Sequence, residues 1–343
     1  MKINTTQLKD IIRQTLVEQE EGEQGEGRAG GGVGNDLWSE KYEAFVTKIG
    51  QNAKDPKTIA FLGAGKLDND PDDDAFDFKE GGIPVAKLRP TQSEVDIDKS
   101  LVYPLDKNPK GFIDFVTLAG NPYTLGAPII TFNGKYVIDG HHRWSQVYAC
   151  NDKASIMAID ISLNTIVDPM DALKAVQAAI AVQAGKVPQQ HVKGSNLFKM
   201  GEADILKWVQ GNVTGAVYKL LDQSSEASAI VFGGHEPAPN LDEVFGLSSQ
   251  DKMDKELEDQ AATEDPKKVK GLASYIWKNV ATLQKKSPPV KGATVRGYMP
   301  QTDDVNWKPP LAKGEIDIAS PHASLQEKKT YERWQQIAKI IKG

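Results

Sequence analysis

The stretch from residue 128 to residue 161 constrains the fold more than any other part of this 343-residue chain. Two short β-rich runs flank an Asn-Gly pair at 133–134, which is the strongest local signal for a β-hairpin. An Asp-Gly pair at 139–140 follows the second run, and a helix with one apolar side begins there. An apolar run at 156–161 then returns as a strand. The order of strand, tight turn, strand, helix and strand predicts a small sheet with helices, and therefore an α+β fold.

Composition divides the chain into three parts. Residues 1–35 begin with an amphipathic leader and continue with a Glu/Gly-rich stretch that cannot bury a core, so we expect a flexible linker there. Residues 36–163 contain the hairpin and are predicted to form the α+β domain. Residues 164–343 carry apolar residues at helical spacing and are predicted to form a mostly helical domain.

Local patterns predict further elements. Alternation over 83–88 predicts a strand, and the segment 111–118 predicts a short helix. The Asp-Pro pair at 168–169 is a typical helix start, with a capping residue followed by proline at the first helical position. Apolar residues spaced by four over 205–217 predict one helix, and those over 272–280 predict another.

Charge and cysteine usage narrow the class of protein. The formal net charge is -6 and the sequence pI is about 5.5, so the chain lacks the overall basic character of a protein that coats DNA. Cys150 is the only cysteine, which excludes an internal disulfide and a cysteine-cluster metal site. No apolar run approaches the ~20 residues needed to span a bilayer, and the N-terminus lacks the apolar segment of a signal peptide. We therefore expect a cytoplasmic protein without a membrane partner.

The residues from Asp139 to Arg143 suit the binding of phosphate at a strand-to-helix junction. Gly140 lets the backbone turn sharply, and the first N–H groups of the helix have no intrahelical acceptor, which makes an anion site. The guanidinium of Arg143 matches phosphate oxygens, and His141 and His142 are able to donate to a phosphate or move a proton. Asp139, at the end of the strand, is positioned to orient these groups. The chemistry fits a di- or triphosphate.

These residues also carry a family resemblance. The segment PIITFNGKYVIDGHHRWSQVYA, residues 128–149, resembles the phosphate-binding core of the ParB/sulfiredoxin superfamily. The upstream segment IPVAKLRPTQSEVDIDKS resembles the first strand of that superfamily and the loop behind it. The superfamily includes chromosome-partitioning CTPases, sulfiredoxins, ADP-dependent free-serine kinases and nucleases. The resemblance covers about residues 82–162 and implies a small mixed sheet with helices that binds a nucleotide.

Within the superfamily, the resemblance is strongest to the serine-kinase branch. Sulfiredoxins have a catalytic cysteine where this chain has His141, and Cys150 lies too far along the helix to replace it. Partitioning proteins have a Glu-Arg-Arg version of the motif and a helix-turn-helix, which we do not find after Ile161. The serine-kinase branch uses Asp-Gly-His-His-Arg, as here, and places a glutamate base on the upstream loop. Glu94 matches that base approximately, and Gln92 beside it is a candidate ligand contact.

The leading hypothesis is a phosphotransferase or nucleotide hydrolase that uses ADP, ATP or CTP. Mg2+ is expected to be held mainly by the phosphates, and no metal ligand is predicted in the protein. The predicted catalytic residues are Glu94, Asp139 and His142. The predicted nucleotide-binding residues are Gly140, His141, His142, Arg143 and Gln92. The sequence leaves open which nucleotide binds, which small molecule or macromolecule accepts the phosphoryl group, and the oligomeric state.

Two alternatives stay open. The first is a ParB-like nuclease or DNA-associated protein, although the acidic charge does not favour DNA as a partner. The second is a packaged or structural bacteriophage protein of the virion without catalysis. Its basis is that residues 1–18 resemble the amphipathic leaders of tailed-phage proteins, and that Leu16-Val17-Glu18 resembles the site at which prohead proteases remove such leaders. A phage-encoded protein would act in the host cytoplasm.

Other segments receive a purely structural interpretation. Residues 61–66 lack the glycine spacing and the Ser/Thr of a Walker A loop. The acidic run 68–77 departs from the EF-hand pattern because Asp73 stands where the turn glycine belongs. His235 is expected to be a loop residue. Arg296, in TVRGYMPQ, receives the same interpretation, although it is long enough to reach a ligand from the third part of the chain.

Overall fold

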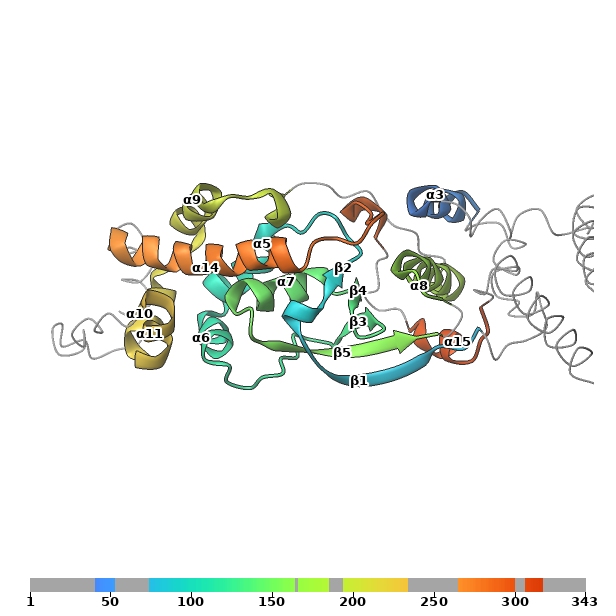
Figure 1. The fold of residues 1–343 in the computed structure, drawn as a ribbon, viewed down its shortest axis with the longest axis horizontal. Helices are drawn as coiled ribbons and strands as arrows, with labels where there is room; N and C mark the ends of the chain where they lie inside the picture. Colours follow the sequence, from blue (N-terminus) through green and yellow to red (C-terminus); the bar gives the residue numbers. More distant parts are fainter. Residues whose placement is uncertain are drawn as a thin grey trace, which may run out of the picture.

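A computed structural model describes residues 41–52, 74–163, 166–184, 194–233, 265–299 and 306–316. The chain has an α+β fold, with a five-stranded mixed sheet between helices (Figure 1). The strands are β1 (Asp77–Pro84), β2 (Arg89–Pro90), β3 (Ile129–Phe132), β4 (Tyr136–Asp139) and β5 (Ser155–Ser162). The helices are α3 (Tyr42–Asn52), α5 (Ile97–Val102), α6 (Pro109–Thr117), α7 (His141–Cys150), α8 (Pro169–Ala184), α9 (Glu202–Asn212), α10 (Gly215–Gln223), α11 (Ser225–Phe232), α14 (Pro266–Lys286) and α15 (Lys308–Ala312).

The sheet has the order β1-β5-β3-β4-β2. β1 pairs with β5 and β3 pairs with β4 in antiparallel fashion, whereas β3 with β5 and β2 with β4 are parallel. The parallel β3–β5 pair requires a crossover, which β4 and α7 provide. The predicted succession of strand, turn, strand, helix and strand is confirmed, and it places the start of α7 at the end of β4.

The tight turn between β3 and β4 follows from two residues with positive φ. Asn133 has φ 52° and Gly134 has φ 63°, and the N–H of Lys135 donates to the carbonyl oxygen of Phe132 at 3.1 Å. Two consecutive left-handed residues give a type I′ turn, whose twist matches that of the paired strands. The hairpin predicted from the Asn-Gly pair is confirmed.

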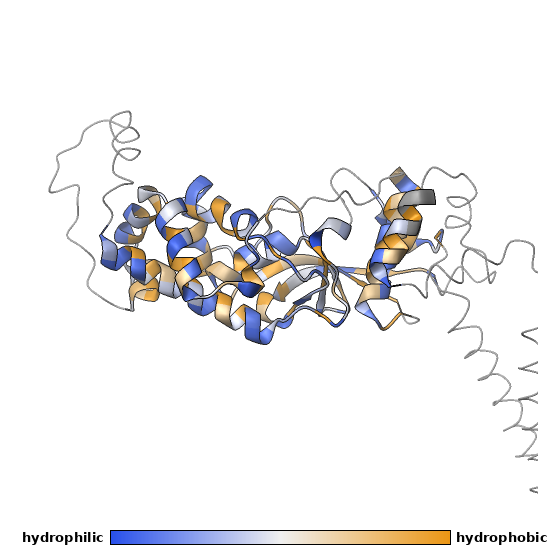
Figure 2. Ribbon diagram, turned by 90° about the horizontal axis from the view of Figure 1, so that it is seen from above, coloured by the Kyte–Doolittle hydropathy of each residue, from blue (hydrophilic) through white to orange (hydrophobic). Residues whose placement is uncertain are grey.

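Two buried apolar clusters cover the two faces of the sheet, because successive side chains of a strand point to opposite faces. Ile129 of β3 and Val137 of β4 belong to the first cluster, which includes residues of α5, α6, α7, α9, α10, α11 and α14. Their neighbours Ile130 and Ile138 belong to the second cluster, which includes residues of α3, α8 and α15. Figure 2 shows that these helices carry both hydrophobic and hydrophilic residues.

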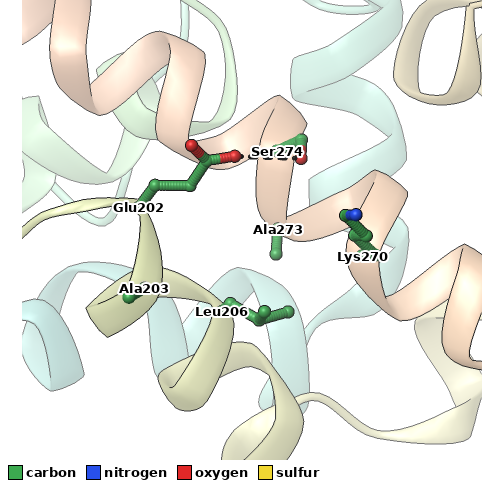
Figure 3. Close-up of a pocket in the computed structure, with 6 residues that line it drawn as sticks. All are labelled: Glu202, Ala203, Leu206, Lys270, Ala273 and Ser274. Atoms are coloured by element: carbon green, nitrogen blue, oxygen red, sulfur yellow. Dashed lines mark hydrogen bonds between the residues drawn. The ribbon is translucent and has the colours of Figure 1, made fainter.

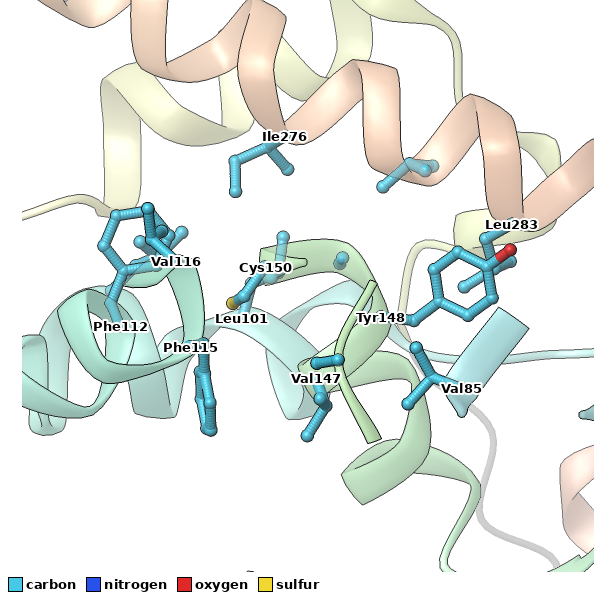
Figure 4. Close-up of a cluster of buried hydrophobic side chains, with 14 of the residues drawn as sticks. Val85, Leu101, Phe112, Phe115, Val116, Val147, Tyr148, Cys150, Ile276 and Leu283 are labelled. Carbon is cyan, nitrogen blue, oxygen red and sulfur yellow. The ribbon is translucent and has the colours of Figure 1, made fainter. Parts of the chain in front are cut away.

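Helix α14 packs across α7 in the first cluster. In Figure 4, Ile276 and Leu283 of α14 point toward the residues of α7 below them. The Tyr275 hydroxyl donates to the carbonyl oxygen of Cys150 at 2.7 Å, and Nδ2 of Asn279 donates to that of Ala149 at 3.0 Å. Both clusters therefore join residues from before and after position 163, and the predicted boundary at 163/164 stays a prediction.

Two predicted elements are wrong in detail. The strand expected over 83–88 ends at Pro84, and Val85–Lys87 forms a 3-10 turn. Val85 and Leu88, three residues apart, are both buried in the same cluster, which a turn of three residues allows and an alternating strand does not. The single helix expected over 205–217 is two helices, because the chain is extended at Val213 and Thr214 between α9 and α10.

Other predictions on local elements have mixed outcomes. The helices expected over 111–118, from 168–169 and over 272–280 are confirmed as α6, α8 and α14. The leader 1–35, the segment 61–66 and His235 lie outside the described residues, as does most of the acidic run 68–77. In the described part of the chain, no helix combines the length and the apolar character needed to cross a membrane.

Candidate functional site

The first turn of α7 begins at Gly140, which has φ 85°. A Cβ on this residue would lie 2.5 Å from Cγ2 of Ile129, so both the backbone conformation and the packing require glycine. The N–H of Trp144 makes the first hydrogen bond of the helix, to the carbonyl oxygen of Gly140 at 2.9 Å. Within the described residues, no side chain caps this turn. The N–H groups at positions 141–143 therefore make a positive helix end that suits an anion.

The ring of His141 is buried between α7 and β2. It is 4% exposed, and its Nε2 atom lies 3.3 Å from Oγ1 of Thr91. The Thr91 hydroxyl has one proton and donates it to the carbonyl oxygen of Val137 at 2.8 Å, so Nε2 of His141 is the donor to Thr91. Burial lowers the pKa of His141 to about 3, which keeps the ring neutral at pH 7. Its backbone N–H is then the group that it offers to a ligand.

His142 has a polar atom that the protein does not satisfy. Its Nε2 is buried and has no hydrogen-bond partner within the described residues. Burial, and then the positive charges of Arg296 and Lys99, lower the pKa of His142 to about 3. The neutral ring has one nitrogen that donates and one that accepts. Because a buried polar atom without a partner costs free energy, Nε2 is the group of this histidine that a ligand would satisfy.

Arg143 is held by acceptors of the protein. Its Nη1 donates to the carbonyl oxygen of Ala127 and, at 3.3 Å, to that of Pro128, and its Nη2 pairs with Oδ2 of Asp139 at 3.3 Å. These contacts leave Nε as its one nitrogen without a partner in the described structure. The guanidinium thus ties α7 to the start of β3, and the phosphate contact predicted for Arg143 stays a prediction.

The loop after β2 carries the two upstream candidates. Gln92 is 2% exposed, and its side-chain nitrogen donates to the carbonyl oxygen of Glu94, so its amide braces the loop. Glu94 is half-buried in this loop, which starts at Thr91 beside His141. The loop therefore lies near the start of α7. The role of Glu94 as a base stays a prediction.

A later segment of the chain runs beside this loop. The N–H of Thr294 donates to the carbonyl oxygen of Thr91 at 3.0 Å, and the N–H of Ser93 donates to that of Thr294 at 2.8 Å. Two residues further on, Nη1 of Arg296 lies 3.2 Å from Oδ2 of Asp96. The structure therefore brings Arg296 to the loop that carries Gln92 and Glu94.

Asp96 joins this ion pair to the start of α5. Its Oδ1 accepts from the N–H of Asp98 at 3.0 Å and caps the helix, whose first turn carries Lys99. The hydroxyl of Ser100 lies 2.8 Å from that of Ser145 on α7, so the starts of the two helices are neighbours. The sequence did not single out Asp96 or Lys99, because no local pattern distinguishes them from ordinary helix-start residues.

A separate groove of about 360 Å3 lies between α9 and α14 (Figure 3). Its lining residues are Glu202, Ala203, Leu206, Lys270, Ala273 and Ser274. The predicted site residues do not line it. Across the described part of the chain, no three His, Cys, Asp or Glu side chains gather as a metal site would require.

The lowered histidine pKa values predict a pH-dependent stability. An unfolded histidine has a pKa of about 6.5, whereas His141 and His142 have pKa values of about 3 in the folded protein. The unfolded state therefore binds protons first, and stability that is fully present above pH ~6.5 is lost as the pH falls toward 3. Between pH 7 and about pH 5.5, we expect the free energy of unfolding to fall by about 1 kcal/mol per histidine.

Guanidinium unfolding of the wild type and of His142→Gln at both pH values would measure this loss. The variant should lose about 1 kcal/mol less than the wild type, because one of the two histidines is absent. An identical loss in the two proteins would show that His142 titrates normally in the folded state.

Comparison with known proteins yields no match: no family model, no curated protein and no solved structure matches the chain.

Proposed function

We propose that the chain binds the di- or triphosphate of a nucleotide at the start of α7 and uses it in phosphoryl transfer or nucleotide hydrolysis. One observation carries this proposal: the uncapped first turn of α7 and the buried, unpartnered Nε2 of His142 lie within two residues of each other. The backbone N–H groups offer hydrogen bonds that a phosphate oxygen would accept, and so does His142 in the tautomer that carries its proton on Nε2. The resemblance to the ParB/sulfiredoxin superfamily points to the same ligand class.

Local charge supports an anionic ligand although the chain is acidic overall. The N-terminus of α7 carries a partial positive charge from its unpaired N–H groups. Lys99 and Arg296 are close enough to His142 to lower its pKa, so their charges act at this place. A polyphosphate entering here would also interact favourably with both cations.

Each residue has a distinct role in this proposal. The N–H groups at positions 141–143 donate to phosphate oxygens, and Nε2 of neutral His142 donates to the transferred group as negative charge develops on it. The carboxylate of Glu94 takes the proton of the attacking hydroxyl or water. Asp139 orients the turn through its ion pair with Arg143. Mg2+, when bound with the nucleotide, would neutralise charge on the phosphates.

Isothermal titration with ADP, ATP and CTP, each with Mg2+, tests the proposal. We expect at least one nucleotide to bind the wild type below millimolar concentration. His142→Ala should weaken that binding by about 10- to 100-fold, because it removes a hydrogen bond to a charged group. Lys270→Ala, in the groove between α9 and α14, is the control and should bind like the wild type. Absence of binding at millimolar nucleotide, or equal binding by His142→Ala, would contradict the proposal.

A nuclease and a virion protein both stay predictions from the sequence.

A further inference from the structure

Arg296 has an unusual set of contacts for a mostly buried arginine. Its side chain is 17% exposed, and its Nη1 pairs with Oδ2 of Asp96 at 3.2 Å. That is the one hydrogen bond of its side chain within the described structure, so Nε and Nη2 have no protein acceptor there. The arginine is therefore fixed at one nitrogen and offers the other two.

The two remaining nitrogens, Nε and Nη2, can donate side by side to one ligand. The Nε–H bond and one Nη2–H bond lie on the same edge of the planar guanidinium and point in the same direction. A phosphate group accepts such a pair with two of its oxygens, and this bidentate geometry is the reason that arginine is preferred at phosphate sites. Arg143 is engaged by more protein acceptors than Arg296, because its Nη1 donates to two carbonyl oxygens and its Nη2 to Asp139.

Asp96 gives the guanidinium a defined orientation. Its other oxygen, Oδ1, accepts from the N–H of Asp98, so the carboxylate is held from both sides. Gly194 packs so closely on this carboxylate that a Cβ there would overlap it. A carboxylate fixed in this way holds Arg296 in one direction and reduces the entropy that its side chain would lose on binding a ligand.

The position of Arg296 relates it to the start of α7. Thr294, two residues earlier, is bonded to the loop after β2, and Asp96 begins the helix whose Ser100 contacts Ser145 of α7. The charge of Arg296 also acts on His142. Arg296 thus approaches the phosphate site from a segment that is 200 residues distant from Asp96 in the sequence.

We infer that Arg296 is a phosphate-binding residue of this site, with Nε and Nη2 as its two donors and Asp96 as its positioning residue. The inference rests on the nucleotide binding proposed above. It assigns to the C-terminal part of the chain a direct contact with the nucleotide, so that the described sheet and the segment around residue 296 together form the site.

Titration calorimetry with the Mg2+ complexes of ADP, ATP and CTP, and with pyrophosphate, tests this inference. Arg296→Lys keeps the positive charge and a donor for Asp96 but removes the paired donors, and we expect it to weaken binding about tenfold or more. Arg296→Ala should weaken it at least as much. Lys291→Ala removes one exposed positive charge from the same segment and should change binding less than twofold. Circular dichroism at the titration temperature confirms that each variant is folded.

The outcomes separate the two proposals. If the wild type binds a nucleotide and Arg296→Lys binds it within twofold of the wild type, the role of Arg296 is overturned while the proposed function stands. Equal weakening by Arg296→Lys and Lys291→Ala would also overturn it, because only the general charge would matter. If the wild type binds no nucleotide and no pyrophosphate, the proposed function and the inference both fail.

Discussion

Replacement of Gly140 by alanine is expected to lower the free energy of unfolding by about 3 kcal/mol, with a range of about 2 to 5. Two costs add. The left-handed φ of 85° disfavours any residue with a Cβ by about 1 to 2 kcal/mol. The new methyl group would also lie 2.5 Å from Cγ2 and 2.9 Å from Cβ of Ile129, so β3 or α7 must move. Chemical denaturation at pH 7 measures the loss.

Gly120→Ala is the matched control. Gly120 has φ 76°, but no atom lies within 4 Å of the position of its Cβ, so the substitution adds strain without overlap. We expect a loss of about 1 to 2 kcal/mol for this variant. Equal losses at the two positions would show that the close contact between Gly140 and Ile129 does not constrain the start of α7. A much larger loss at Gly140 would support the packing described here.

Replacement of Trp144 by alanine should cost about 3 to 5 kcal/mol, which is typical of a large aromatic residue removed from a core. Trp144 is fully buried in α7, and its Nε1 donates to the carbonyl oxygen of Val85 at 3.0 Å. Its ring also makes an edge-to-face contact with Tyr148 at 5.7 Å between centroids. The substitution leaves a cavity between α7 and the turn that follows β1, and should also loosen the first turn of α7.

Trp277→Ala, on α14, provides the comparison for the same chemical change. Trp277 is only partly buried where it packs against the first cluster, so we expect about half the loss in the free energy of unfolding. Denaturation followed by circular dichroism measures both variants. A loss at Trp144 no greater than that at Trp277 would contradict the placement of α7 at the centre of this core.

The features that the sequence predicts well depend on local chemistry. The hairpin follows from Asn133 and Gly134, which adopt positive φ at little cost, and the helix start at Asp168 follows from a side chain that caps the next turn. The strand expected up to Leu88 is wrong because Val85 and Leu88, three residues apart, are buried in the same cluster, which fits a 3-10 turn and not an alternating strand. The choice between a strand and a turn at residues 85–88 depends on which elements pack against them.

The part of the candidate site that lies within one short motif is also predictable from the sequence. Gly140 and the histidines lie in one short motif, so their proximity is guaranteed by the chain. The ion pair between Asp96 and Arg296 joins two segments separated by 200 residues. No local pattern in either segment predicts that the two are in contact. The hydrogen bonds that hold Arg143 go to the carbonyl oxygens of Ala127 and Pro128. The motif at 139–143 does not predict where those carbonyl groups lie.

Nuclear magnetic resonance can locate the residues at which a nucleotide binds. Amide signals in a two-dimensional NMR spectrum of the deuterated protein would be followed while the Mg2+ complex of ADP, ATP or CTP is added. We expect the largest saturable shifts for the N–H groups of His141, His142 and Arg143, at the uncapped turn of α7. Shifts confined to other places, such as Glu202 and Lys270 in the groove between α9 and α14, or no saturable shift at all, would contradict it.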